Sequence, residues 1–112
     1  NPWPLPAKAQ FDLIFSANML HIASWICCPG LMQGAARHLT ADGLLVTYGP
    51  YLEQDVPTAP SNLAFDADLR QRNASWGIRQ LADVEKEAGR AGLQLRQRIS
   101  LPANNLLLVF SR

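Results

Sequence analysis

Residues 11–17, Phe-Asp-Leu-Ile-Phe-Ser-Ala, are apolar at nearly every position. A strand with one face in water alternates apolar and polar residues, whereas such a run is typical of a strand buried on both faces, in a parallel sheet covered by helices. The segment is also a poor sheet edge, because edges are normally protected by charge, proline or brevity and this one offers only Asp12. We therefore expect both edges of the strand to be paired, by more of a larger domain or by another copy of the chain.

The next segments predict a strand, helix, strand unit. Apolar residues recur every three or four positions from Ser24 to Leu39, which indicates a helix with Ser24 as its N-cap. Pro29 lies inside this segment, so the helix should kink there or begin late. Residues 41–43, Ala-Asp-Gly, predict a turn, and the apolar residues 44–48 predict a second buried strand.

Two further helices are expected in the second half of the chain. Residues 52–60 are polar and contain two prolines, which predicts a loop. Ser61 should then cap a helix of about ten residues. A second helix should run from about residue 79 to 91 and close at Gly92. The side chains expected to face inward are Leu63, Phe65 and Leu69 in the first helix and Leu81, Val84, Ala88 and Ala91 in the second.

The chain then predicts an antiparallel pair of strands. Residues 93–101 alternate with a break in phase at Gln97 and Arg98, as in an outer strand. Residues 106–110 are uniformly apolar and follow a four-residue turn, Pro-Ala-Asn-Asn, at 102–105. The simplest arrangement places the two strands side by side in opposite directions.

Composition limits the classes of partner. Ten Lys and Arg against nine Asp and Glu give a net charge of +1, and no stretch concentrates one sign, so neither nucleic acid nor an anionic membrane is indicated. The longest apolar run, 106–110, is far shorter than the roughly 20 residues that span a bilayer, and the first six residues lack the pattern of a signal peptide. We expect a cytoplasmic protein.

Cys27 and Cys28 are adjacent and lack partners at metal-ligand spacing, so no metal is predicted.

Several motifs carry a resemblance to a known family. Residues 11–14 followed by 17–21, Ala-Asn-Met-Leu-His, and the later 42–44, Asp-Gly-Leu, resemble the second half of class I S-adenosylmethionine (SAM)-dependent methyltransferases. The more specific stretches are 48–51 (Tyr-Gly-Pro-Tyr), 58–62 (Thr-Ala-Pro-Ser-Asn) with 65–66 (Phe-Asp), 74–79 (Ala-Ser-Trp-Gly-Ile-Arg) and 102–106 (Pro-Ala-Asn-Asn-Leu). Together these are similar to the methyltransferase-like family called domain of unknown function 938, from Trp3 to Arg112.

This resemblance implies the C-terminal half of a doubly wound, Rossmann-like methyltransferase sheet. Residues 1–112 would be one truncated domain, with an opening loop at 1–9 and the fourth to seventh strands of a seven-stranded sheet within 10–112, the last strand inserted antiparallel. The family's glycine-rich turn has no counterpart among the scattered glycines, nor does an acidic residue that would hold the ribose. We therefore expect this chain alone to bind SAM weakly or not at all, and to be inactive.

Ligands of open α/β sheets lie beyond the carboxyl ends of the parallel strands, which directs attention to the residues after each strand. Ala17, Asn18 and Met19 are the candidates for the cofactor side, since a small residue and an amide allow close approach and orientation. His21 is the candidate base, because its ordinary pKa near 6.5 suits proton abstraction. The alternative for His21 is a helix cap or a buried polar residue.

Tyr51 is the second candidate for catalysis, as a donor to the methyl acceptor, and the alternative is an aromatic residue packed under the loop. The candidates for substrate binding are Asn62, Asp66, Trp76 and Arg79. Asp66 and Arg79 form either part of the substrate site or an ion pair with each other.

Two further features have structural interpretations. His38 is interpreted as a cap at the end of its helix. Asn104 and Asn105 are interpreted as turn residues, with a pocket-lining role as the alternative.

Two functions from different classes follow. The first hypothesis is a SAM-dependent methyltransferase acting on a small molecule and represented here by its C-terminal part. The alternative is a non-catalytic methyltransferase-like module that binds another protein. In either case the exposed edge of the first strand offers a route to a homo-oligomer.

Overall fold

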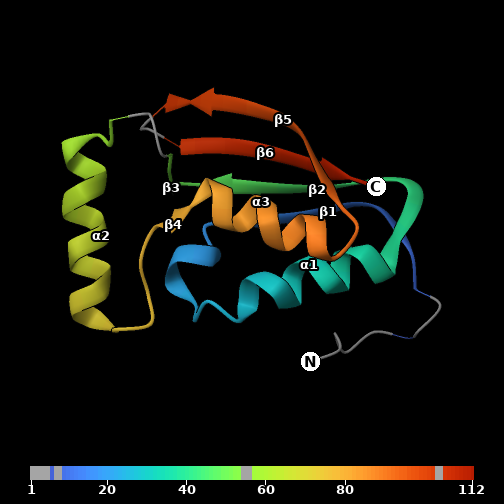
Figure 1. Ribbon diagram of the computed structural model, residues 1–112, viewed down its shortest axis with the longest axis horizontal. Helices are drawn as coiled ribbons and strands as arrows, with labels where there is room; N and C mark the ends of the chain where they lie inside the picture. Colours follow the sequence, from blue (N-terminus) through green and yellow to red (C-terminus); the bar gives the residue numbers. More distant parts are fainter. Residues whose placement is uncertain (1–5, 7–8, 54–56, 103–104) are drawn as a thin grey trace.

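Four strands form one sheet in the order β1-β2-β6-β5, as seen in the computed structural model of Figure 1. Strand β1 (Phe11–Ala17) runs parallel to β2 (Leu39–Gly49), and β6 (Asn105–Ser111) is antiparallel to both β2 and β5 (Gln94–Leu101). The last strand is therefore inserted antiparallel, as the resemblance implied, and the α/β class is confirmed. The structure describes residue 6 and residues 9–53, 57–102 and 105–112. Most of the expected opening loop lies outside these residues.

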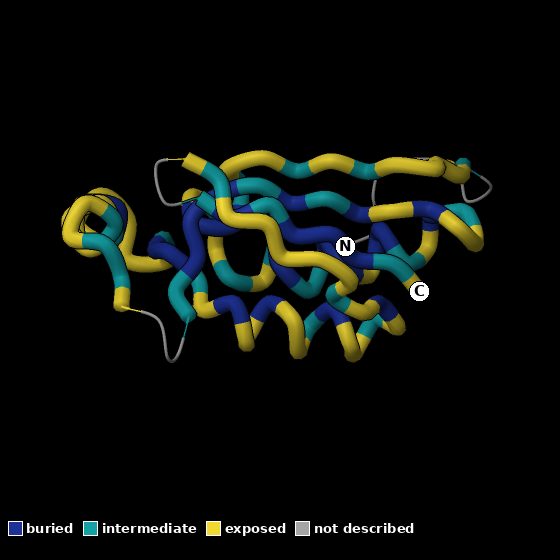
Figure 2. Tube along the Cα trace, turned by 90° about the horizontal axis from the view of Figure 1, so that it is seen from above, coloured by how far each residue is buried: buried dark blue, intermediate teal, exposed yellow. Residues whose placement is uncertain are grey.

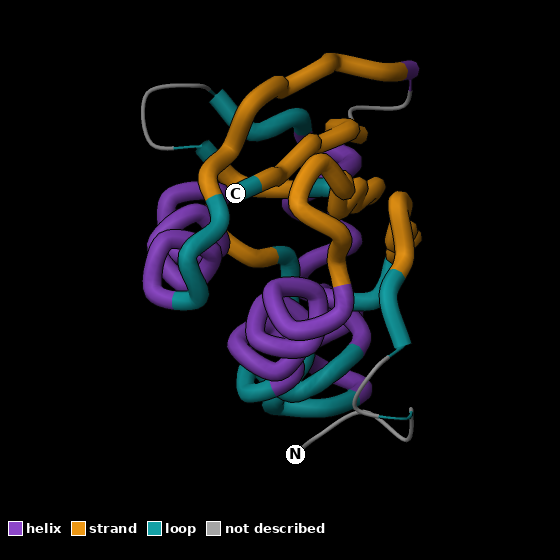
Figure 3. Tube along the Cα trace, turned by 90° about the vertical axis from the view of Figure 1, so that its right-hand side faces the viewer, coloured by secondary structure: helices purple, strands orange, loops and turns teal. Residues whose placement is uncertain are grey.

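Two helices cover one face of this sheet. Helix α1 (Cys27–His38) and helix α3 (Leu81–Arg90) lie on the same side of the strands in the end-on view of Figure 3. Helix α2 (Pro60–Arg72) lies beyond the end of the sheet in Figure 1. A short 3-10 helix, η1 (Leu20–Ile22), follows β1. No helix in the described part of the chain is long and apolar enough to cross a membrane.

A second, two-stranded sheet joins the sequence after β2 to the segment before α3. Its strands, β3 (Tyr51–Leu52) and β4 (Arg79–Gln80), are parallel, and Tyr51 is paired with Arg79. The sequence pattern predicted a loop at residue 52 and a helix at residue 79, so both predictions are corrected here. The pairing brings the end of β2 next to the segment that precedes α3.

Helix α1 begins later than its expected N-cap, Ser24. It starts at Cys27, so Ser24 is not the N-cap, although the Ser24 carbonyl accepts a hydrogen bond from the Cys27 amide at 3.0 Å. Pro29 then lies in the first helical turn, where its missing N–H removes no helical hydrogen bond. The predicted late start near Pro29 is confirmed.

The predicted turn at residues 41–43 is wrong, because β2 begins at Leu39 and continues through this segment. The register with β1 moves from Phe11 opposite Leu39 to Leu13 opposite Leu44, so β2 holds extra residues in a bulge. A Cβ added at Gly43 would lie 2.9 Å from the Phe11 carbonyl oxygen. The glycine therefore permits close approach of the two backbones.

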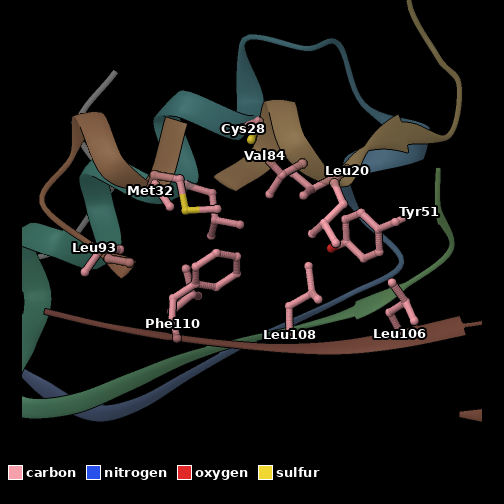
Figure 4. Packing of buried hydrophobic residues seen from close by; sticks show 14 of the residues in the cluster. Leu20, Cys28, Met32, Tyr51, Val84, Leu93, Leu106, Leu108 and Phe110 are labelled. Atoms are coloured by element: carbon pink, nitrogen blue, oxygen red, sulfur yellow. The ribbon is translucent and has the colours of Figure 1, made fainter. Parts of the chain in front are cut away.

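The hydrophobic core lies between the sheet and the two covering helices. Figure 4 shows Leu108 and Phe110 of β6 pointing toward Met32 of α1 and Val84 of α3, and all four side chains are fully buried. The inward face predicted for α3 is confirmed: Leu81, Val84 and Ala88 are buried and Ala91 packs against the core. Gly92, with φ of +88°, ends this helix as expected.

Helix α2 buries less than the sequence predicted. Its side chains at Leu63 and Phe65 are 55% and 39% exposed, and only Leu69 is buried. These two side chains are not inward because α2 lies beyond the end of the sheet and has no face of the main core beneath it. Figure 2 accordingly shows this helix mostly in the colour of exposed residues.

The opposite face of the sheet carries apolar side chains that no described helix covers. Phe11, Leu13 and Phe15 of β1 are 40–58% exposed, and Leu44 of β2 and Ile99 of β5 are about as exposed as Phe11. We call this surface the uncovered face. Strand β1 is paired only with β2 among the described residues, so the second partner expected for it is not found within this part of the chain.

Candidate functional site

The carboxyl ends of β1 and β2 lie side by side, which is where an α/β sheet places its ligands. Ala17 is opposite Tyr48, and the amide of Asn18 donates to the Tyr48 carbonyl at 2.8 Å. Asn18 has a φ of 54°, an uncommon conformation for a residue other than glycine. The chain therefore turns sharply after β1 while it stays attached to β2.

Gly49, at the end of β2, lies against two of the predicted site residues. A Cβ built on Gly49 would lie 3.5 Å from the Asn18 side-chain oxygen and 3.7 Å from Cε1 of His21. Asn18 and His21 thus converge on the backbone of Gly49. The three residues form the candidate site, which we call the strand-tip site.

His21 is held uncharged in this position. Its side chain is buried, and its ring lies edge-on to Phe65 of α2 with ring centres 5.6 Å apart. Burial lowers the pKa of His21, and the positive charge of Arg79 lowers it further. The imidazole is therefore neutral at pH 7 and has a lone pair with which to accept a proton.

Arg79 was predicted to bind substrate, but its guanidinium is occupied by backbone carbonyls. Its Nε donates to Leu20 at 3.0 Å, and one terminal nitrogen donates to Ala23 and to Ser75, each at 2.7 Å. The guanidinium also lies over the Trp25 ring, 5.6 Å from its centre. Arg79 therefore holds the backbone on both sides of His21.

The predicted ion pair between Asp66 and Arg79 is wrong. Asp66 pairs instead with Arg70, one helical turn along α2, at 3.1 Å. Its other contact is the amide of Ile78, which donates to the carboxylate at 2.8 Å. Trp76 is partly exposed in the turn before this amide. Asp66 thus ties α2 to the segment leading to Arg79, and the substrate-binding roles of Asp66 and Trp76 stay predictions.

Tyr51 points its hydroxyl into the core. The hydroxyl donates to Oγ1 of Thr47 at 2.9 Å in a buried hydrogen bond, and burial raises the pKa of Tyr51 to about 12. This is the geometry of the packed-aromatic alternative, and it gives the phenol a partner other than a substrate.

A polar pocket of about 200 Å³ lies beside Tyr51, away from His21. Asn62, at the start of α2, lines it together with Asn105, so the pocket-lining alternative for Asn105 is confirmed. Glu53 and Arg98 form an ion pair at 2.5 Å in its wall. Asn104 lies outside the described residues. Tyr51 and Asn62 are thus brought together, but in a pocket separate from the strand-tip site.

The end of α1 is held by residues from distant parts of the sequence. Nδ1 of His38 donates to the Ala9 carbonyl at 2.8 Å, so this histidine contacts the segment before β1. The guanidinium of Arg112 donates to the carbonyls of Ala36 and Leu39. Sequence reasoning missed Arg112, because nothing local relates it to a helix more than seventy residues earlier.

The three cofactor-side candidates follow one another directly at the carboxyl end of β1. Ala17 and Asn18 are exposed, whereas Met19 is partly buried against the core. Gly49 lies next to them and has no side chain, and the small Ala17 permits the close approach of a small group. The sequence has no glycine-rich turn to form the rest of a cofactor site. The residues present therefore fit part of the cofactor.

Solved structures with the same fold include methyltransferases. An O-methyltransferase family 2 protein from Planctomyces limnophilus, solved with apigenin, is 20% identical, with a TM-score of 0.82 over 100% of this chain and 32% of its own. Mitomycin 7-O-methyltransferase MmcR is 16% identical, with a TM-score of 0.81 over 94% and 30%. LepI, solved in complex with SAM, is 19% identical, with a TM-score of 0.79 over 98% and 28%. The chain shares the α/β fold of these proteins and spans about a third or less of their length.

A comparison of the sequence with protein-family models identifies the family. The family model described as "Protein of unknown function (DUF938)" matches residues 1–112. The chain belongs to this family, as the motifs predicted.

Proposed function

We propose that this chain is the C-terminal part of a SAM-dependent methyltransferase that acts on a small molecule. The observation that carries the proposal is the strand-tip site, in which Asn18 and a buried, neutral His21 converge on the backbone of Gly49. The site lies at the carboxyl ends of two parallel strands, where this class of sheet binds its ligands. Fold alone does not determine the reaction, and these side chains are what supports the proposed chemistry.

When bound, SAM supplies the electrophilic methyl group. The residues of this chain then have two tasks, because methyl transfer depends mainly on alignment of the reacting atoms. The amide of Asn18 orients the ligand, and the small Ala17 leaves room beside it. A ring nitrogen of His21 accepts the proton that the acceptor group loses, which its lowered pKa permits at neutral pH.

We also propose that the uncovered face and the free edge of β1 are covered by the remainder of a larger domain. The apolar side chains of β1 and the short span of this chain against its structural neighbours both support this. A second copy of the chain is the alternative occupant. Sedimentation of the 112-residue protein measures its oligomeric state and so distinguishes the two occupants. A dimer that buries Leu13 and Phe15 supports the second copy. A monomer that binds an apolar dye supports the larger domain.

Titration calorimetry tests the methyltransferase proposal in a protein that includes the residues preceding this chain. SAM should release or absorb heat with the native protein, and Asn18→Ala should weaken binding. Asn73→Ala is the matched control, because Asn73 lies in an exposed turn and its side chain accepts only from neighbouring Ser75 in the described structure. His21→Ala should lower turnover more than affinity. No measurable binding by the longer protein contradicts the proposal and favours the non-catalytic module.

A further inference from the structure

Three hydrogen bonds hold the loop that carries His21 to one short segment. The amide of Gly77 donates to the carbonyl of His21 itself at 3.0 Å, and Arg79 donates to the carbonyls of Leu20 and Ala23 on either side of it. We call residues 77–79 the holding segment. The loop after β1 thus has its backbone acceptors satisfied by a part of the chain about sixty residues away.

The same segment is attached to α2. Asp66 of α2 accepts from the amide of Ile78, the middle residue of the holding segment, at 2.8 Å. Arg70 of α2 packs against Gly77 so closely that a Cβ there would lie 2.7 Å from its guanidinium carbon. Phe65, which precedes Asp66 on α2, is the residue whose ring lies edge-on to His21. One segment therefore fixes both the backbone and the ring surroundings of His21.

Arg79 has the geometry to orient this loop. A guanidinium presents its donors in a rigid plane, and here one plane reaches three carbonyls while its face rests on Trp25. A lysine has a single ammonium on a flexible stem and does not reproduce this arrangement. The charge of Arg79 is also close enough to act on the imidazole of His21.

We infer that Arg79 is a positioning residue, which sets the orientation of the His21 imidazole at the strand tip through the backbone of residues 20–23. Its role is to act through His21, because its hydrogen bonds in the described structure go to backbone carbonyls. The inference depends on the proposed role of His21 as a base. It also explains why a residue with the chemistry of a substrate ligand has its donors directed at the protein backbone.

Histidine NMR of the 112-residue protein tests this inference without cofactor or substrate. Arg79→Gln should raise the pKa of His21 toward its ordinary value and weaken the nuclear Overhauser contacts between the rings of His21 and Phe65. Arg79→Lys keeps the charge, so it should weaken the ring contacts while the pKa stays lowered. Arg90→Gln is the control, because Arg90 is exposed on α3 and pairs with Glu87. An Arg79→Gln protein in which His21 titrates and contacts Phe65 as in the native chain overturns the inference.

Native-state hydrogen exchange provides a test that needs no variant. The amide of Gly77 should be protected in the native protein, because it donates to the His21 carbonyl. Exchange of this amide at the rate of an unfolded chain contradicts the attachment of the holding segment to the His21 loop, on which the inference depends, even if both Arg79 variants fail to fold. Failure of the longer protein to bind SAM, in contrast, contradicts the methyltransferase proposal and leaves these measurements unchanged.

Discussion

Replacement of Gly49 by alanine tests the backbone geometry at the strand tip. Gly49 has a φ of +156°, and the added Cβ meets its nearest neighbours, in Asn18 and His21, at 3.5–3.8 Å, which is ordinary van der Waals contact. The cost should therefore come from the backbone and not from a collision. Residues held in such sparsely populated conformations cost about 1–3 kcal/mol each, so Gly49→Ala should lower the free energy of unfolding by that amount.

Gly89→Ala is the matched control for this substitution. Gly89 lies in α3 without a positive φ, and nothing lies within 4 Å of its added Cβ. Alanine is about 1 kcal/mol more favourable than glycine inside a helix, so this change should stabilise the protein. Urea unfolding followed by tryptophan fluorescence measures both variants, which should differ by about 2–4 kcal/mol. A Gly49→Ala protein as stable as the native chain refutes the reasoning.

Three further predictions concern the surroundings of the site. The pKa of His21 is lowered in the folded protein, so below pH 6.5 the unfolded chain binds more protons than the folded one. The free energy of unfolding should therefore fall as the pH drops from 6.5. In urea titrations at stepped pH, His21→Gln should flatten this dependence. Tyr51→Phe removes the buried hydrogen bond to Thr47 and should cost about 0.5–1.5 kcal/mol, so an unchanged urea midpoint argues against that bond. Leu69→Ala should cost about 2–5 kcal/mol and Leu63→Ala less than about 0.5 kcal/mol; similar losses for both contradict the placement of α2.

The elements with strong local patterns were predictable from the sequence. The uniform apolar character of residues 11–17 and the alternation after Gly92 predicted β1 and β5, and the three-or-four spacing of Leu81, Val84 and Ala88 predicted the buried face of α3. These patterns follow from the geometry of one strand or one helix. They need no knowledge of what lies beside them.

The errors arose where a distant contact decides the local structure. Ala-Asp-Gly at 41–43 is turn-like in isolation, but the approach of β1 makes it part of a bulged strand. Leu63 and Phe65 have helical spacing, yet α2 has no core face beneath it. Tertiary placement overrides both local signals.

The location of the candidate site was predictable from the sequence, but the contacts of its side chains were not. The rule that ligands lie at strand tips depends on topology, and it directed attention to Asn18 and His21, which the structure places together beside Gly49. It could not show that Arg79 turns its guanidinium toward backbone carbonyls, or that Tyr51 points into the core. Side-chain direction depends on neighbours that are remote in sequence.

The insertion of β6 between β2 and β5 has a consequence for biosynthesis. β2 and β5 do not pair with each other in the described residues. The sheet can therefore form only after residues 105–111 of β6 are available to pair with both strands. During translation, the chain emerges with Leu45 and its neighbours lacking the Phe110 that will sit against them. Such non-local closure is slow and leaves intermediates with exposed apolar surface, which are prone to aggregate. Nascent chains stalled before residue 105 should therefore depend on chaperones more than chains that include residues 105–111.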